Sequence, residues 1–193
     1  LYGGNSSEFV ISEKSSGQIL QELSSLPYNF YPIRVQNNEW IFTTNNREYK
    51  IDLNDFSLIL EEEKKIIFDF AFIIIHGTPG EDGKLQAYLD IQKIPYNTPG
   101  VFVNALTFNK YACKLYLKNF DIATPEAVLY KEGQEIDEDK ILKKTGLPCF
   151  IKPNNGGSSF GTTKVLTKEQ VKPAIQEALK EDKEVIIESF VKG

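Results

Sequence analysis

The residues with the clearest chemical potential are Lys152 and the glycine-rich stretch that follows it, residues 154–164. The stretch contains Gly156, Gly157 and Gly161 among hydroxyl and amide side chains, and apolar runs flank it on both sides. Glycine allows a close approach of the backbone to a ligand, and successive backbone N–H groups can bind anionic oxygens. No Gly-Lys-Ser/Thr follows the glycines, so this is not a Walker loop. The pattern predicts a phosphate-binding hairpin loop beside a fixed positive charge; a flexible glycine-rich turn beside a solvated lysine is the alternative.

Three further residues could bind charged groups. Glu8 lies at the head of a predicted helix, where its carboxylate could hold an ammonium group or simply favour the helix dipole. His76 follows an apolar stretch, 68–75, that predicts a buried strand, and strand ends of open α/β sheets face ligands. It could donate to a carboxylate or be an ordinary core histidine. Lys110 lies in the first turn of a predicted helix, where a cation opposes the dipole, which indicates a phosphate contact or a solvated surface lysine.

The elements that must position these residues differ between the two parts of the chain. A short strand, two glycines and a helix open the first part, as in an α/β sheet, and a hairpin around 44–46 follows. A helix over 108–119, capped by Thr107, begins the second part. The second part continues with strands, the glycine hairpin and a helix with a Thr167/Gln170 capping box, which predicts an α+β layer.

Composition restricts the class of protein. The 193 residues carry a net charge of −5, which argues against a nucleic-acid or membrane-surface protein. No run has the length of a transmembrane helix. Cys113 and Cys149 are far apart, so we expect reduced thiols and a cytoplasmic protein. The sequence has no methionine and begins and ends within strand patterns, so we expect it to continue at both ends.

Several stretches together resemble the D-alanine–D-alanine ligase family, ATP-grasp enzymes of peptidoglycan precursor synthesis. The resemblance is carried by GGNSSE at 3–8, HGTPGEDGKLQ at 76–86, NK at 109–110, IKP at 151–153, GSSFG at 157–161 and VIIE at 185–188. It implies an α/β pre-ATP-grasp (Rossmann-like) domain over 1–104 and the α+β front portion of an ATP-grasp domain over 105–193. It also implies ATP-dependent ligation of two D-alanines through an acyl phosphate, and a homodimer.

The resemblance further implies roles for individual residues. Glu8, supported by Ser158, would hold the ammonium group of the first D-alanine, and both would be catalytic. His76 would lie near the carboxylate of that D-alanine. The residues implied in ATP binding are Lys110, Lys152, Gly157 and Ser159 at the phosphates, and Glu188, Ser189, Phe190 and Val191 at the adenine.

The metal site is the point at which the sequence departs from the family pattern. The ligands for Mg²⁺, or possibly Mn²⁺, are expected beyond Gly193, with none in this chain, so we expect this chain by itself to lack ligase activity. Another ATP-grasp carboxylate–amine ligase, such as a D-alanine–D-lactate ligase, is one alternative. A non-catalytic nucleotide-binding module that reuses the fold is the other.

Overall fold

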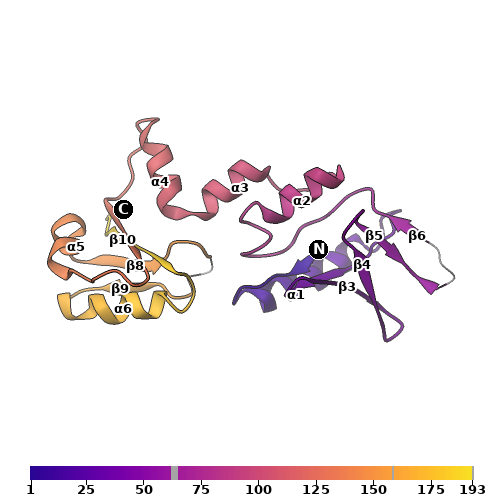
Figure 1. Cartoon of the computed structure of the whole chain (residues 1–193), viewed down its shortest axis with the longest axis horizontal. Helices are drawn as coiled ribbons and strands as arrows, with labels where there is room; N and C mark the ends of the chain where they lie inside the picture. The colour runs from indigo at the N-terminus through magenta and orange to yellow at the C-terminus, as the bar shows by residue number, and fades with distance from the viewer. Residues whose placement is uncertain (62–64, 158, 193) are drawn as a thin grey trace. The chain divides into compact units, whose positions relative to one another are not determined.

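The structure, a computed structural model, describes residues 1–61, 65–157 and 159–192 (Figure 1). The chain forms two compact units, Leu1–Ala105 and Leu106–Gly193. Within the described ranges, no helix combines the length and apolar character needed to cross a membrane.

The first unit contains a mixed sheet. Its elements are β1 (Tyr2–Gly3), α1 (Phe9–Leu23), β2 (Ile33–Gln36), β3 (Glu39–Thr44), β4 (Arg47–Asp52), β5 (Ser57–Ile59), β6 (Lys65–Ile67) and α2 (Lys84–Gln92). The strands follow one another in the sheet in chain order. Strands β1 and β2 are parallel, and the other neighbouring strands of this sheet are antiparallel. The predicted hairpin is confirmed, and Asn45 and Asn46 at its tip adopt φ values of 49° and 59°, as a two-residue turn between twisted strands requires.

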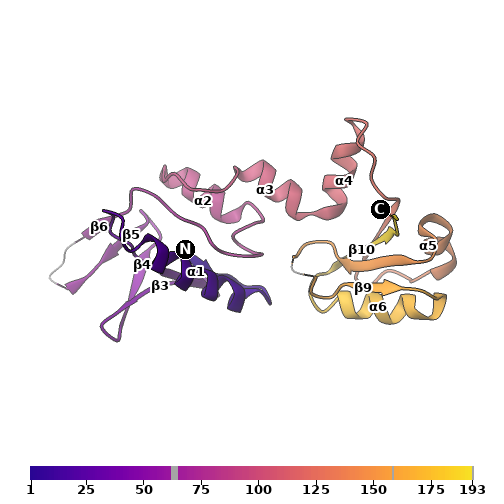
Figure 2. The ribbon, with the colours of Figure 1, turned by 180° about the vertical axis from the view of Figure 1, so that it is seen from behind.

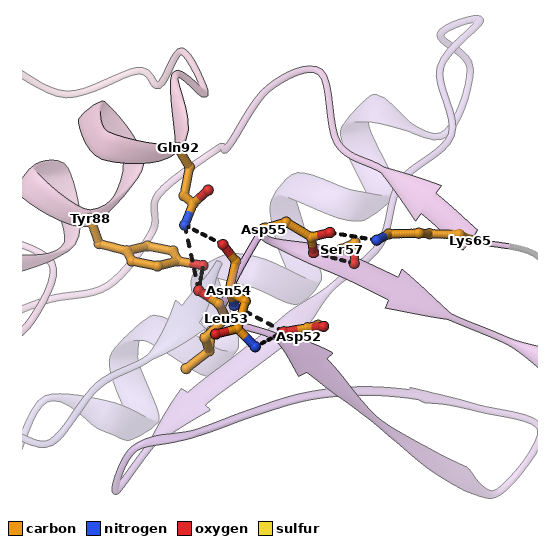
Figure 3. A network of polar contacts seen from close by, with 8 residues as sticks. All are labelled: Asp52, Leu53, Asn54, Asp55, Ser57, Lys65, Tyr88 and Gln92. Carbon is orange, nitrogen blue, oxygen red and sulfur yellow. Dashed lines mark hydrogen bonds and ion pairs between the residues drawn. The ribbon is translucent and has the colours of Figure 1, made fainter.

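The turn between β4 and β5 is tied to α2 by side chains (Figure 3). The Tyr88 hydroxyl donates a hydrogen bond to the carbonyl of Leu53 at 3.0 Å, and Gln92 donates to the same turn. Burial, and then the charges of Asp55 and Asp52, raise the pKa of Tyr88 to about 12. These contacts anchor the helix that follows the His76 segment.

The stretch 68–75 was predicted to form a buried strand, but it does not form a regular strand. Ala71 makes a single bridge, to Tyr96, and the N–H of Ile74 donates to the carbonyl of Leu1 at 2.9 Å. The segment is extended, but these partners are isolated positions on irregular segments, so no continuous ladder forms. Its side chains alternate, with Ala71, Ile73 and Ile75 buried and Phe70 and Phe72 exposed.

The second unit is built around an antiparallel sheet. Its elements are α4 (Lys110–Lys118), β7 (Ala127–Lys131), α5 (Glu138–Thr145), β8 (Cys149–Pro153), β9 (Thr163–Val165), the 3₁₀ turn η2 (Lys168–Gln170), α6 (Val171–Ala178) and β10 (Glu184–Ser189), and α3 (Val101–Phe108) precedes α4. The strand order is β7-β10-β8-β9. The predicted α+β layer, the glycine hairpin between β8 and β9, and the Thr167/Gln170 capping box are confirmed.

Helices α5 and α6 cover one face of this sheet, and Figures 1 and 2 both show α6 lying along it. The side chains that pack against them are alternate residues of the strands, among them Ile151 of β8 and Val185 and Ile187 of β10. Successive side chains of a strand point to opposite faces. Lys152 and Glu188 therefore point to the face that α5 and α6 leave uncovered.

The predicted cap of the helix over 108–119 was also wrong. Thr107 lies inside α3, and α4 begins after Asn109. The side chain of Asn109 accepts a hydrogen bond from the N–H of Ala112 at 2.9 Å, as an N-cap residue does. Thr and Asn are both good cap residues, so residue preference alone does not distinguish the two positions.

Candidate functional site

In the first unit, Glu8 lies at the start of α1 and is only 4% exposed. Its carbonyl accepts the N–H groups of Ile11 at 2.9 Å and Ser12 at 3.1 Å, which fixes the first turn of the helix. Its carboxylate lies close to Gly77, since a Cβ placed there would be 3.6 Å from Glu8 Oε2. The structure thus places the carboxylate beside the loop that begins at His76.

The loop at His76 is held against the head of α1 by Ser6. The Ser6 hydroxyl donates to the carbonyl of His76 at 2.9 Å and accepts the N–H of Glu8 at 3.3 Å. Gly77 adopts a φ of +73°, and a Cβ there would lie 2.7 Å from Ser6 Oγ. Only glycine fits this position without displacement, so Gly77 allows partly buried His76 and buried Glu8 to share one corner of the unit.

In the second unit, the face of the sheet opposite α5 and α6 carries a carboxylate between two lysines. Lys114 Nζ on α4 donates to Glu188 Oε1 at 2.6 Å, and Lys152 Nζ on β8 forms an ion pair with Glu188 Oε2. The exposed side-chain fractions are 11% for Lys114, 13% for Glu188 and 26% for Lys152. Burial raises the pKa of Glu188, but the hydrogen bonds from Lys114 and Lys152 outweigh it and hold the pKa below its usual range. The cluster therefore carries a net positive charge.

The glycine hairpin is anchored at its base by Lys110. Lys110 Nζ donates to the carbonyl of Gly156 at 2.6 Å. Beyond this base, Gly157 and Ser159 are exposed, and Ser159 has a φ of 63°. Ser158 lies outside the described residues.

Asn154 joins the base of the hairpin to two other elements. Its side chain is fully buried; Oδ1 accepts the N–H of Tyr111 at 2.9 Å and Nδ2 donates to Glu184 Oε2 at 2.9 Å. Its carbonyl accepts the N–H of Lys110 at 3.1 Å. The start of α4, the end of β8 and the start of β10 are therefore held by one side chain.

The segment after β10 places aromatic surface near a cation. The rings of Phe190 and Phe150 are 6.1 Å apart, and Lys164 Nζ lies 4.7 Å from the centre of the Phe190 ring. The N–H of Ser189 donates to the backbone carbonyl of Glu126 at 2.9 Å, and the N–H of Phe190 donates to the carbonyl of Pro148 at 3.2 Å. Val191 is 63% exposed.

Sequence reasoning missed Lys114 and Asn154. Lys114 follows Lys110 by one helical turn, and residues four apart share a helix face, so this spacing was a usable signal. Asn154 resembled any polar residue of a turn. Among the residues that the structure describes, no three His, Cys, Asp or Glu side chains come together in a way that could hold a metal ion.

Both units match models of known protein families. Residues 1–99 match the family described as "D-ala D-ala ligase N-terminus", and residues 116–193 match "D-ala D-ala ligase C-terminus". The fold is that of an ATP-grasp ligase: an α/β domain followed by the front portion of an ATP-grasp domain. The chain belongs to the D-alanine–D-alanine ligase family.

Similar proteins and solved structures agree with this assignment. The D-alanine–D-alanine ligase of Phocaeicola vulgatus is 48% identical over 192 residues, covering 99% of this chain and 59% of the relative. The crystal structure of the Helicobacter pylori D-alanine–D-alanine ligase has a TM-score of 0.84 at 27% identity, covering 100% of this chain and 63% of that one. The Vibrio cholerae D-alanyl-alanine synthetase A has a TM-score of 0.82 at 33% identity, covering 99% and 58%. The chain thus spans about three fifths of the length of the relatives it matches.

Proposed function

We propose that the protein ligates two D-alanine molecules in a reaction driven by ATP. The observation that carries this proposal is the lysine-bearing face of the second sheet, which leads into a glycine hairpin at the end of β8. Membership of the ligase family supports it. A polyanion such as the triphosphate of ATP suits such a basic, partly buried face.

The proposed reaction follows from the chemistry of a carboxylate. A carboxylate is a poor electrophile, so one of its oxygens first attacks the γ-phosphorus of ATP, which forms an acyl phosphate and releases ADP. The amine of the second D-alanine then attacks the acyl carbon, and inorganic phosphate leaves as the peptide bond forms. Catalysis of such transfers depends mainly on positioning and on neutralising phosphate charge. We assign these tasks to Lys110, Lys152 and the hairpin that contains Gly157 and Ser159.

The adenine would lie against the segment after β10. The Phe190 ring beside Phe150 offers an apolar surface for stacking. Because the N–H groups of Ser189 and Phe190 already donate within the unit, the base would pair with other backbone groups of the segment from Glu188 to Val191.

The first D-alanine would be bound by the first unit. Glu8 would pair with its ammonium group, and His76 would donate to its carboxylate. The burial of Glu8 supports this role, because a low-dielectric site strengthens the attraction to an ammonium group. The assistance of Ser158 depends on the family resemblance alone.

The described residues of this chain do not form a site that suits a divalent metal ion. Mg²⁺ prefers carboxylate, carbonyl and water oxygens, and the described residues bring together no set of acidic side chains for it. The proposed roles of this chain's own residues are therefore limited to binding, orientation and charge neutralisation. A homodimer remains part of the proposal from the family resemblance, and a cytoplasmic location remains part of it from the two widely separated cysteines, Cys113 and Cys149.

The test separates the two substrates. In the full-length protein, Lys152→Ala should weaken ATP binding measured by calorimetry, whereas Glu8→Ala should raise the KM for D-alanine and leave the ATP affinity nearly unchanged. Lys143→Ala, at an exposed position on α5, is the control and should change neither quantity. If both variants lost ATP affinity and raised the KM for D-alanine equally, the separate roles of Lys152 and Glu8 would be contradicted. If the wild-type protein formed no D-alanyl-D-alanine, the proposed function itself would be contradicted.

A further inference from the structure

The pairing of Lys152 raises a question about the proposed phosphate contact. In the structure this lysine forms an ion pair with Glu188, so a phosphate must draw it away from a carboxylate that is only 13% exposed. Removing one partner from a buried charge pair is strongly unfavourable when the remaining charge has no other partner. Lys152 can therefore exchange partners easily only if Glu188 keeps a second cation.

Lys114 has the geometry of that second cation. It donates to Oε1 at 2.6 Å, whereas Lys152 pairs with Oε2, so one contact can break without disturbing the other. Lys114 is the more buried lysine, at 11% exposed against 26% for Lys152. The less buried lysine, Lys152, is thus the one whose side chain can change partners, and Lys114 is held in place.

The backbones that carry these side chains are fixed by the sheet. Lys152 lies opposite Ile186 in the β8–β10 ladder, and Glu188 lies opposite Phe150 in the same ladder. Antiparallel partners two residues apart remain close enough for long side chains to meet diagonally. Only the side chain of Lys152 needs to move, and the ladder remains intact.

We propose that Lys114 is a positioning residue that keeps Glu188 neutralised while Lys152 transfers from that carboxylate to a phosphate of ATP. This inference rests on the proposed function. Before transfer the three side chains carry a net charge of +1 by count; after transfer, Lys114 and Glu188 form a neutral pair and the charge of Lys152 is available to the nucleotide.

The experiment measures ATP affinity by calorimetry, together with the KM for each substrate, in the full-length protein. Lys114→Met should weaken ATP binding about tenfold, in line with coupling between contacting charges, because Glu188 then retains Lys152 as its remaining partner. The KM for D-alanine should not change. Lys114→Arg, which preserves the cation, should bind ATP as the wild type does.

The second substitution distinguishes positioning from a merely structural role. Combining Lys114→Met with Glu188→Gln should restore ATP affinity to within about threefold of the wild type, since a neutral amide does not retain Lys152. Glu188→Gln alone should bind ATP at least as tightly as the wild type, because the adenine contacts proposed for the segment from Glu188 to Val191 are made by its backbone. This measurement stands even if Lys114→Met folds poorly.

The outcomes are separable. Wild-type affinity in Lys114→Met, failure of Glu188→Gln to restore binding in a folded double variant, or weaker binding by Glu188→Gln alone would each overturn the inference. A wild-type protein that binds no ATP would instead overturn the proposed function.

Discussion

Replacing Asn154 with alanine should destabilise the second unit by about 2–4 kcal/mol. The side chain is fully buried and connects α4 to β8 and β10 through Tyr111 and Glu184. Alanine is too short to reach either partner, and no solvent reaches the site to replace them. The backbone bonds of residue 154 to Lys110 and Glu184 survive the substitution.

The magnitude comes from the two lost hydrogen bonds. The N–H of Tyr111 becomes a buried donor without its acceptor, which costs about 1–3 kcal/mol. Glu184 loses one donor but keeps Lys131 at 2.7 Å, so the loss there is smaller, about 0.5–1 kcal/mol. The cavity left by the amide adds to these terms.

A neighbouring asparagine provides the matched control. Asn155 donates from its side chain to Asp182 at 2.8 Å, but its backbone N–H donates to the same oxygen at 2.7 Å and remains after substitution. Asn155 is also partly exposed, so Asn155→Ala should cost only about 0.5–1 kcal/mol.

Urea unfolding followed by far-UV circular dichroism measures both variants, and hydrogen exchange at the amide of Tyr111 reports the local loss. That amide should exchange more than tenfold faster in Asn154→Ala, because each 1.4 kcal/mol changes an opening equilibrium about tenfold. The reasoning fails if Asn154→Ala costs less than about 1 kcal/mol or no more than Asn155→Ala.

Two further predictions concern the first unit. Tyr88→Phe removes the hydrogen bond to Leu53 and should cost about 0.5–1.5 kcal/mol in urea unfolding. The pKa of Tyr88 in the folded protein exceeds the ordinary value of 10.0, so the hydroxyl stabilises the fold below pH 10 and this stabilisation is lost as the pH rises through about 12. Tyr88→Phe should therefore lack this loss of stability at alkaline pH. A variant with the same pH profile as the wild type would contradict the assignment. Gly77→Ala should destabilise by about 1–3 kcal/mol and raise the KM for D-alanine, because its φ of +73° and its contact with Ser6 exclude a Cβ. Gly17→Ala, at a position in α1 where a Cβ meets nothing within 4 Å, should be neutral or stabilising; equal effects of the two would refute this explanation.

Features with short-range signals were predictable from the sequence. The hairpin at Asn45–Asn46, the capping box at Thr167 and the glycine hairpin between β8 and β9 each depend on residues within a few positions of one another. Turn geometry, capping and alternation act over that range. The α+β layer of the second unit followed from the order of these local elements.

Features for which the sequence allows more than one local structure were harder to predict. The sequence predicted Thr107 as the N-cap of α4, whereas Asn109 is the N-cap in the structure. Both residue types can accept hydrogen bonds from the first N–H groups of a helix, so only the position of α3 decides between them. The stretch 68–75 has the apolar content of a strand, but a strand needs a partner, and the neighbouring segments supply only isolated bonds.

By itself, the sequence determined the lysines, the glycine hairpin and the alternation that turns Lys152 away from the helices. The tertiary structure decided which groups these residues meet. Glu188 pairs with Lys114, which is 74 positions away, because the β8–β10 ladder and α4 bring the two together. No local propensity encodes that distance, since packing and ladder register create the pair only when three elements have assembled. The charge beside the hairpin was therefore predictable, but the carboxylate that holds it was not.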